Sequence, residues 1–223
     1  MAVQTGGPGY KNPADASYDI IVTSQNFFVA PYGWAETTSG TGAVTQGPMS
    51  AVLTSGGTMD GRAAMNCSAN GLTFGGTYYY IDWDLPLTIE FTVARLTSNA
   101  DSTFYVQLKQ DNAFGALADD GIGIYIENLR IYGESFGSAL MNGDTGITMV
   151  SGQPYRVQIR HRPGVGVEYW INGTLSRTNV LAADIPSGDS TATCYLCIGC
   201  HNNATATEVK LIMSGIKIWQ AMP

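Results

Sequence analysis

Apolar and polar residues alternate at every second position in two neighbouring runs, 155–160 and 165–171. This period of two is the signature of β-strands with one buried face. Arg-Pro-Gly at 162–164 predicts a three-residue turn between the runs. Asn-Gly at 172–173 predicts a type I′ turn after them, because both residues tolerate positive φ. The stretch 152–177 is therefore predicted to be a meander of three antiparallel strands.

If no bulge intervenes, the two turns also set the register of the meander. The expected cross-strand neighbours are Val157 and Tyr169, Gln158 and Glu168, Glu168 and Arg177, and Arg156 and Trp170. One face of the meander would then belong to the core, and the other would be a polar surface that carries one large aromatic side chain.

Further short runs predict strands along the rest of the chain. They cover 18–23, 27–30, 51–54, 62–66, 87–95, 103–109, 121–127, 129–132, 193–199 and 208–220. The run 103–109 is expected to pair with the run 87–95 across a short loop, while 32–49 and 135–146 are expected to be loops. Short strands at even spacing, with no helix of useful length, predict an all-β sandwich.

The meander also resembles a known family. The pattern Tyr-Arg-Val-x-Ile followed by Val-x-Tyr-Trp-Ile-Asn-Gly-Thr-Leu, at 155–175, is similar to a signature of the concanavalin A-like lectin/glucanase superfamily, especially its laminin-G-like branch. The segments 87–93 and 195–219 agree with it, so the resemblance covers roughly residue 59 to the C-terminus. It implies a two-sheet antiparallel jelly-roll β-sandwich, and it is more informative about fold than about function.

The N-terminal residues differ from the rest. Residues 1–17 are rich in glycine and proline and show no periodicity, which predicts an extended arm and a single sandwich domain over 18–223. They lack the basic and apolar regions of a signal peptide, and no apolar run in the chain is long enough to span a bilayer. Such a chain works where it is made, leaves the cell as part of a particle, or has had a leader removed; of these, we expect a protein of a virion surface or of the extracellular space.

The charge balance limits the partners. Charged residues make up 13% of the 223 residues, and the formal net charge is −7. Nucleic-acid binding needs clustered Lys and Arg, so this balance disfavours nucleic acid and, for the same reason, an anionic membrane. Other protein subunits, in a capsid or a homo-oligomer, and glycans are the expected partners.

Three cysteines and a histidine form the pattern Cys-x2-Cys-x2-Cys-His at 194–201, which could in principle ligate zinc. The stretch is a predicted strand, so Cys194 and Cys200 would share one face and Cys197 would lie on the other. Four such side chains cannot converge on one tetrahedral ion without a sharp bend. Small, half-buried cysteines are the expected reading, and a disulfide to Cys67 stays open.

A calcium site is the remaining metal hypothesis. The loop around 111–120 carries Asp111, Asp119 and Asp120, and calcium prefers loops rich in oxygen ligands. Many members of the resembled superfamily bind one calcium ion near such a rim. Turn formation alone also explains aspartate beside glycine. The expectation is therefore no cofactor, with calcium at these three residues as the alternative.

The sequence offers little support for any candidate catalytic residue. The hydrolases of the resembled superfamily place their acids as Glu-x-Asp-x-x-Glu along one strand, and this motif is absent. Retaining glycosidases need two carboxylates about 5 Å apart, whereas Asp82 and Asp84 lack a third acid and Glu168 stands alone. His161 is expected to be a surface histidine beside a turn. The sequence thus predicts that the protein is not an enzyme.

Aromatic residues are the stronger candidates for binding. Glycans stack on Trp and Tyr rings while polar groups fix the hydroxyls. The candidate carbohydrate-binding residues are Tyr78, Tyr80, Trp83, Trp170 and Arg156. The alternative is that these aromatics close the ends of the sandwich core.

Two classes of function follow from this reading. The first is a non-catalytic structural or surface protein of a virion, such as a phage decoration or fibre component, which also adheres to glycans. The second is a carbohydrate-binding module or lectin. A glycoside hydrolase is a distant third alternative, because no catalytic motif supports it.

Overall fold

The structure is a computed structural model of the chain, and it describes residues 19–23, 35–47, 50–68, 72–74, 77–79, 81–97, 101–110, 115–188 and 194–221. Strands dominate these residues, which contain a single short 3-10 helix, η1 (Ala182–Asp184). No helix in the described part of the chain has the length and apolar character needed to cross a membrane. The predicted arm, 1–17, and the expected strand 27–30 lie outside the described residues.

Two antiparallel sheets make up the fold. The eight-stranded sheet has the order β15 (Thr174–Asn179), β14 (Gly166–Ile171), β13 (Pro154–Arg162), β8 (Leu87–Arg95), β17 (Lys210–Ala221), β4 (Ser50–Thr54) and β3 (Ala43–Gln46), with β1 (Asp19–Thr23) paired to β17. The seven-stranded sheet has the order β12 (Leu140–Thr148), β11 (Arg130–Phe136), β10 (Gly121–Glu127), β9 (Thr103–Lys109), β16 (Tyr195–His201), β5 (Arg62–Ser68) and β2 (Ala35–Ser39). A small separate hairpin contains β6 (Leu72–Phe74) and β7 (Thr77–Tyr79).

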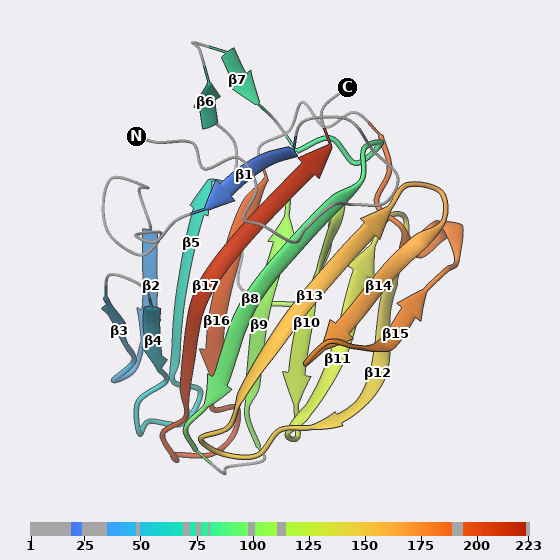
Figure 1. Cartoon of the computed structure of the whole chain (residues 1–223). Helices are drawn as coiled ribbons and strands as arrows, with labels where there is room; N and C mark the ends of the chain where they lie inside the picture. Colours follow the sequence, from blue (N-terminus) through green and yellow to red (C-terminus); the bar gives the residue numbers. More distant parts are fainter. Residues whose placement is uncertain are drawn as a thin grey trace.

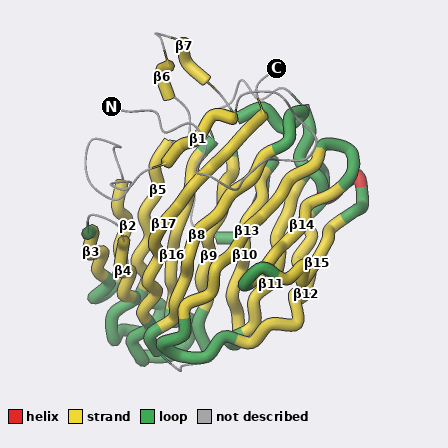
Figure 2. The backbone as a smooth tube through the Cα atoms, viewed as in Figure 1, coloured by secondary structure: helices red, strands yellow, loops and turns green. Residues whose placement is uncertain are grey.

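The sheets are stacked as two layers (Figure 1), and the described loops gather at the ends of the strands (Figure 2). The predicted all-β, two-sheet antiparallel jelly-roll sandwich is confirmed. Between the layers lies a single apolar core, to which both sheets contribute every second residue. Ile89 and Val157 of one sheet and Val106, Ile124 and Ile198 of the other are almost fully buried there. Burial of each such side chain contributes roughly 1.5–3 kcal/mol.

The meander β13–β14–β15 exists as predicted, and its second turn has φ of 51° at Asn172 and 81° at Gly173. The predicted register of its first hairpin is wrong by two residues. Ile159 pairs with Tyr169, and Gln158 pairs with Trp170. The reason is that β13 extends to residue 162, so that the three-residue turn occupies 163–165 and not 162–164. The faces predicted for the strands survive, because a shift of two residues preserves side-chain alternation.

A β-bulge changes the second hairpin. The register of β14 with β15 shifts between Tyr169 and Trp170, so that Arg177 pairs with Tyr169. The expected neighbour Glu168 pairs with Thr178 instead. The prediction assumed no bulge, and a bulge adds one residue to one strand of the pair.

The partner of β9 was also predicted wrongly. β8 pairs with β13 and β17, whereas β9 pairs with β10 and β16 in the opposite sheet. Consecutive strands therefore lie in different layers here. Both strands alternate apolar with polar residues, and this alternation shows that one face is buried but does not reveal which sheet each strand joins.

Two expected loops contain strands. β2 and β3 lie within 32–49, and β12 begins within the region expected to be a loop at 135–146 and extends to residue 148. β2 is exposed along its whole length, and β12 mixes glycine with polar residues. Edge strands of this kind bury little apolar surface, so they lack the hydrophobic alternation on which strand prediction depends.

Candidate functional site

Three tyrosines from neighbouring strands lie side by side on the outer face of the seven-stranded sheet. Tyr105 on β9 pairs with Tyr125 on β10, which pairs with Tyr132 on β11. The β10–β11 turn at 128–129 has positive φ at both residues, as a type I′ turn requires, and this turn sets Tyr125 opposite Tyr132. We call these three residues the tyrosine ladder.

The rings of the ladder face one another. The ring centroids of Tyr105 and Tyr125 are 5.1 Å apart with planes inclined by 29°, and those of Tyr125 and Tyr132 are 5.8 Å apart with planes inclined by 37°. The first pair is stacked, and the second pair packs face toward face with a larger tilt. The outward aromatic faces at the two ends of the ladder therefore belong to Tyr105 and Tyr132, and all three side chains are half-buried.

The phenols of Tyr105 and Tyr125 remain protonated at neutral pH. Burial raises the pKa of Tyr105 to about 12, and the nearby carboxylates of Glu134 and Glu127 add to the effect. Burial also raises the pKa of Tyr125, as does its hydrogen bond with Glu127. Protonated hydroxyl groups can both donate and accept hydrogen bonds.

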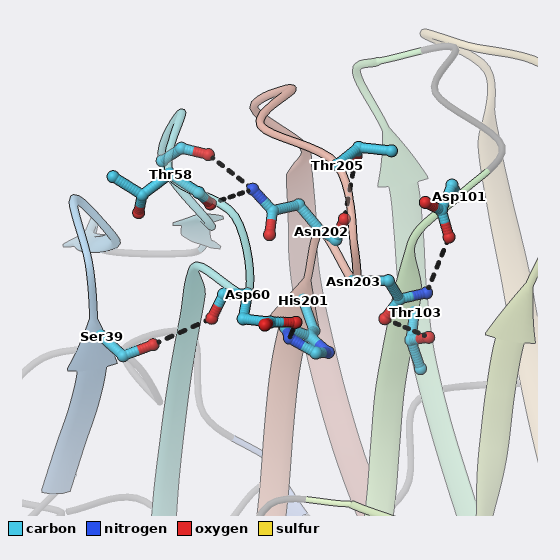
Figure 3. Close-up of polar contacts among 10 residues, drawn as sticks. Ser39, Thr58, Asp60, Asp101, Thr103, His201, Asn202, Asn203 and Thr205 are labelled. Atoms are coloured by element: carbon cyan, nitrogen blue, oxygen red, sulfur yellow. Dashed lines mark hydrogen bonds and ion pairs between the residues drawn. The ribbon is translucent and has the colours of Figure 1, made fainter.

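A cluster of polar side chains lies at one end of this face, where β16 ends and β5 and β9 begin (Figure 3). Nε2 of His201 is 3.6 Å from Oδ1 of Asp60. Thr103 donates a hydrogen bond to Asn203 (3.2 Å), and Nδ2 of Asn203 donates to Asp101 (3.4 Å). We call Asp60, Asp101, Thr103, His201 and Asn203 the rim cluster. Thr103 also hydrogen bonds with Tyr125, which joins the rim cluster to the ladder.

The loop that carries Asp60 is fixed by its own hydrogen bonds. The buried Asn202 donates from Nδ2 to the carbonyl oxygens of Gly56 (3.1 Å) and Thr58 (2.7 Å). Ser39 donates to the carbonyl oxygen of Asp60 (3.2 Å), as Figure 3 also shows. These contacts hold the Asp60 carboxylate beside His201.

His201 is electrically neutral at pH 7. Burial lowers its pKa, and the charge of Arg62 lowers it further. The carboxylates of Asp60 and Asp101 and the hydrogen bond with Asn203 act in the opposite direction, but the net shift is downward. The histidine therefore contributes hydrogen-bonding capacity to the rim and no positive charge.

On the other side of the ladder, the same face carries a buried polar group. The side chain of Glu134 on β11 is 0% exposed, accepts a hydrogen bond from Gln107 on β9, and accepts another from the backbone N–H of Leu117 (3.0 Å). Gln107 and Glu134 are both register partners of Gly123. A Cβ atom at Gly123 would lie 2.7 Å from Cγ of Gln107, so glycine here permits the bridge across β10.

The charge of Glu134 is only partly compensated. Burial raises its pKa, while the hydrogen bonds from Gln107 and Leu117 and the nearby charge of Lys109 lower it. Lys109 is itself 0% exposed. This group anchors the 115–120 segment on the sheet and is enclosed, whereas the ladder is half-open.

The outer end of the ladder adjoins an exposed carboxylate. Asp144 on β12 is the register partner of Tyr132 and forms an ion pair of 2.9 Å with Arg130. The two side chains are 41% and 48% exposed, respectively. An aromatic ring beside a solvent-accessible carboxylate is a combination that suits polyhydroxylated ligands, since the ring takes an apolar face and the carboxylate accepts hydroxyl protons.

The outer face of the eight-stranded sheet is different. Arg156 forms an ion pair of 2.9 Å with Glu90. Arg160 donates to Gln158 (2.9 Å), and its guanidinium lies 4.7 Å from the ring centroid of Trp170.

Trp170 and its neighbours complete that network. The indole N–H of Trp170 donates to Glu168 (3.0 Å), and Arg162 lies 3.2 Å from the same carboxylate. One face of Trp170 is thus occupied by Arg160 and its only polar atom is bonded. Trp170 and Arg156 lie on one face as predicted, and both belong to a network that the chain satisfies by itself.

The other predicted carbohydrate-binding residues divide into two groups. Trp83 is 0% exposed, and its ring meets that of His161 edge-on at 5.5 Å. The prediction for Trp83 is therefore wrong, because its ring closes the end of the core. Tyr80 and the side chain of Tyr78 lie outside the described residues, so their roles stay predictions.

His161 was predicted to be a surface residue and is buried, with 1% of its surface exposed. It continues the inward face of β13, and its Nε2 lies 3.0 Å from the carbonyl oxygen of Pro186. Burial lowers its pKa. The β13 strand extends further than expected, to residue 162. His161, which was predicted to lie on the surface beside the turn, therefore belongs to the strand and points into the core.

Two further acids, Asp82 and Asp84, accept hydrogen bonds from backbone N–H groups in loops. Oδ1 of Asp82 accepts a hydrogen bond from the N–H of Asp84 (2.8 Å), and Oδ1 of Asp84 accepts one from the N–H of Gly188 (2.8 Å). Asp119 is exposed, and burial together with the charge of Asp119 raises the pKa of Asp120. Asp111 lies outside the described residues, so the calcium hypothesis stays a prediction.

The cysteines of β16 alternate as predicted. Cys200 pairs with Phe104 on the core side, and Cys197 pairs with Gln107 on the outer side. Burial raises the pKa of Cys200 to about 12, so its thiol stays protonated. Among the described residues no group of three or more His, Cys, Asp or Glu side chains is arranged to hold a metal ion. A pairing with Cys67 is not described, because the side chain of that residue lies outside the described part.

Comparison with known proteins places the fold. No protein-family model matches the sequence, and no curated protein does either. The endo-β-1,4-glucuronan lyase of the fungus Trichoderma reesei is 14% identical, with a TM-score of 0.57 over 83% of this chain and 90% of that chain. The carbohydrate recognition domain of Emp47p is 10% identical, with a TM-score of 0.58 over 90% of this chain and 95% of that chain.

A third similar structure is that of botulinum neurotoxin type C, described as dependent on interaction with two ganglioside molecules for cell entry. It is 13% identical, with a TM-score of 0.55 over 90% of this chain, and the match spans about half (48%) of the toxin chain. At these identities the likeness concerns the fold, a jelly-roll sandwich shared with a lectin-like domain, a lyase and the binding domains of toxins.

The tyrosine ladder was missed at the sequence level, although part of its signal is local. Tyr125 and Tyr132 flank the turn at 128–129 symmetrically, so a two-residue hairpin would have paired them. Tyr105 joins them only through the pairing of β9 with β10 across a long loop. That pairing is not encoded in any short stretch of the sequence.

Proposed function

We propose that this chain is a non-catalytic glycan-binding protein, and that its binding site is the outer face of the seven-stranded sheet at the tyrosine ladder. The observation that carries the proposal is the row of three half-buried tyrosines that ends beside the exposed Asp144–Arg130 pair. Aromatic faces with a few polar groups around them are the usual composition of a saccharide site.

The structural neighbours support glycan binding at the level of the fold. One of them is a carbohydrate recognition domain, and another is a toxin that interacts with gangliosides. The opposite face is the weaker candidate. Its one described aromatic–cation contact, Arg160 over Trp170, already occupies a face of the indole.

The lack of catalysis is part of the proposal. Glu134 shares one property with the acid of a catalytic pair, because burial raises its pKa. Both of its oxygens are nevertheless hydrogen-bonded within the chain, and the side chain is fully enclosed. Asp82 and Asp84 bind backbone N–H groups in a turn. These arrangements favour structural roles for the three acids.

A glycan array followed by calorimetric titration of the strongest oligosaccharide tests the proposal. Tyr132→Ala should weaken binding about tenfold or more, the loss typical of a central aromatic contact. Trp170→Ala is the matched control on the opposite face and should bind like the wild type. Circular dichroism of both variants checks the fold. Binding that survives Tyr132→Ala and is lost in Trp170→Ala would move the site to the eight-stranded sheet.

The narrower prediction, a decoration or fibre protein of a virion, rests on the sequence of residues 1–17. Deletion of these residues should leave the melting temperature nearly unchanged and weaken self-association or attachment to a particle, because the arm has few apolar residues with which to stabilise a core. A truncated chain that unfolds, or that assembles as well as the full chain, would count against the virion assignment and leave a lectin.

A further inference from the structure

The two outer faces of the sandwich carry opposite charges. On the eight-stranded sheet, the described outward cations outnumber the acids: Arg156, Arg160, Arg162, Lys210 and Lys217 stand against Glu90, Glu168 and Glu208, the ion-pair partner of Lys210. The chain as a whole is acidic, with a formal net charge of −7. The cations are therefore concentrated on the face opposite the tyrosine ladder.

The ladder side shows the reverse. Carboxylates surround it, from Glu127, which is bonded to Tyr125, to Asp144 beside Tyr132 and to Asp60 and Asp101 in the rim cluster. Asp60 is 68% exposed, so its charge reaches solvent and any ligand that approaches the rim.

The cations described on the ladder side are fewer than its carboxylates and compensate only part of this charge. Lys109 is fully buried beside Glu134, and Arg130 is paired with Asp144. Arg62 is exposed next to His201, and the histidine is neutral at pH 7. A ligand with carboxylate or sulfate groups would meet like charges here. Like charges across an interface disfavour binding, whereas hydroxyl groups can donate hydrogen bonds to the same carboxylates.

From this arrangement we infer that the ladder site selects uncharged saccharides and rejects those that carry uronate, sialate or sulfate groups. The inference rests on the proposed function and specifies its ligand class. An uncharged sugar stacks on the end face of Tyr132 and donates hydroxyl protons to Asp144, with Arg130 holding the carboxylate in place. A uronate at the same position sets its own carboxylate against Asp144 and Glu127.

Matched oligosaccharides that differ only at C6 test the inference on the full chain. Suitable pairs are β-1,4-glucan with β-1,4-glucuronan hexasaccharides and β-1,4-mannan with β-1,4-mannuronan hexasaccharides, next to a general array of neutral, sialylated and sulfated glycans. Neutral members should bind at least about tenfold more tightly than their acidic counterparts, the effect of one or two like-charge contacts at the protein surface. The difference should narrow in about 1 M salt, where the screening length falls to about 3 Å.

Removal of the carboxylates should relax this selection. Asp144→Asn combined with Glu127→Gln should reduce the neutral-to-acidic affinity ratio several-fold. Glu168→Gln on the opposite face is the matched control and should leave the ratio unchanged. Because the readout is a ratio within one variant, a general loss of affinity does not imitate the expected result.

Three outcomes are possible, and each decides something. Tighter binding of neutral glycans that depends on Asp144 and Glu127 supports the inference. Equal or tighter binding of acidic glycans, lost in Tyr132→Ala, overturns the inference while the proposed function stands. No binding to any glycan of the array or the pairs overturns both.

Discussion

Both sheets carry aromatic side chains on their outer faces, but the contacts that these side chains make differ between the two sheets. On the eight-stranded sheet, Trp170 is covered by Arg160 and bonded to Glu168. On the seven-stranded sheet, the rings of the tyrosine ladder are half-buried and pack on one another. We therefore expect a ligand at the ladder and not at Trp170, whose ring the chain itself covers.

The faces also differ in how their charges are buried. Glu134 is enclosed on the seven-stranded sheet, while the acids of the eight-stranded face lie in a network that reaches solvent through Arg156 and Arg162, which are 57% and 52% exposed. Disrupting an enclosed polar group lowers the free energy of unfolding strongly, whereas an exposed ion pair contributes little to that free energy. The comparison therefore predicts unequal responses to similar substitutions.

The largest effect is expected for Glu134→Ala. The variant leaves Gln107 and the N–H of Leu117 without their buried acceptor and removes the carboxylate charge near Lys109, and removing one partner of such a group costs about 3–5 kcal/mol. Glu168→Ala on the other face should cost no more than about 1 kcal/mol. Urea denaturation measures both. An equal loss of unfolding free energy in the two variants would contradict the predicted difference between the faces.

Gly123→Ala comes next. The new Cβ would approach Cγ of Gln107 to 2.7 Å and disturb the bridge to Glu134, so overpacking should lower the free energy of unfolding by about 1–3 kcal/mol. Gly47→Ala is a suitable control, because its Cβ would make only an ordinary contact of 3.4 Å with Ser50. A neutral Gly123→Ala would mean that the bridge across β10 is not constrained by the glycine.

A turn of the eight-stranded sheet provides the third prediction. Gly173 has a φ of 81°, and Gly173→Val forces a β-branched residue into that conformation at a cost on the order of 1–2 kcal/mol. Gly173→Asn, which tolerates positive φ better, should restore part of the loss. An unchanged melting temperature in the valine variant would contradict the type I′ turn.

The fourth prediction is a pH dependence confined to the seven-stranded face. The folded-state pKa of Glu134 lies above the ordinary glutamate value of 4.5, because burial outweighs its hydrogen bonds. The native state therefore binds more protons than the unfolded state between 4.5 and the raised pKa, and the contribution of this group to stability falls as pH rises through that window. The difference in unfolding free energy between wild type and Glu134→Gln should change with pH there. A flat difference would contradict the raised pKa.

The smallest effect is expected from metal removal. Cys200 lies in the core with its pKa raised to about 12, and Cys197 lies on the other face of β16. A chelator should leave the melting curve unmoved, and metal analysis should find no stoichiometric zinc. A stoichiometric ion whose removal lowers the melting temperature would support either the cysteine hypothesis or the calcium hypothesis at Asp111, Asp119 and Asp120.

The sequence predicted the elements whose pattern is local. β8 and β9 have the bounds that alternation indicates, and the turn at 172–173 has the geometry that Asn-Gly favours. The sequence did not reveal which sheet each strand joins, because strands with one buried face show the same alternation whichever layer they occupy. The exposed edge strands β2 and β12 lack the apolar signal altogether.

The site was harder to predict than the fold. Trp83 and Tyr105 both look like aromatic residues near polar ones in the sequence, yet one closes the core and the other joins a surface row. The difference depends on strand pairing over long sequence distances. The register of the meander failed for a related reason, since one extra residue in β13 and one bulge in β14–β15 moved each neighbour.

The most direct test of the central claim is a nuclear magnetic resonance titration of protein labelled with ¹³C in the tyrosine rings and ¹⁵N in the tryptophan indoles, using the strongest glycan from the array. Single substitutions, Tyr→Phe for the ladder and Trp170→Phe, assign the signals. The account predicts that the ring signals of Tyr132 and its ladder neighbours shift in proportion to occupancy while the indole signal of Trp170 does not move. A shifting Trp170 signal with unmoved ladder signals would contradict it.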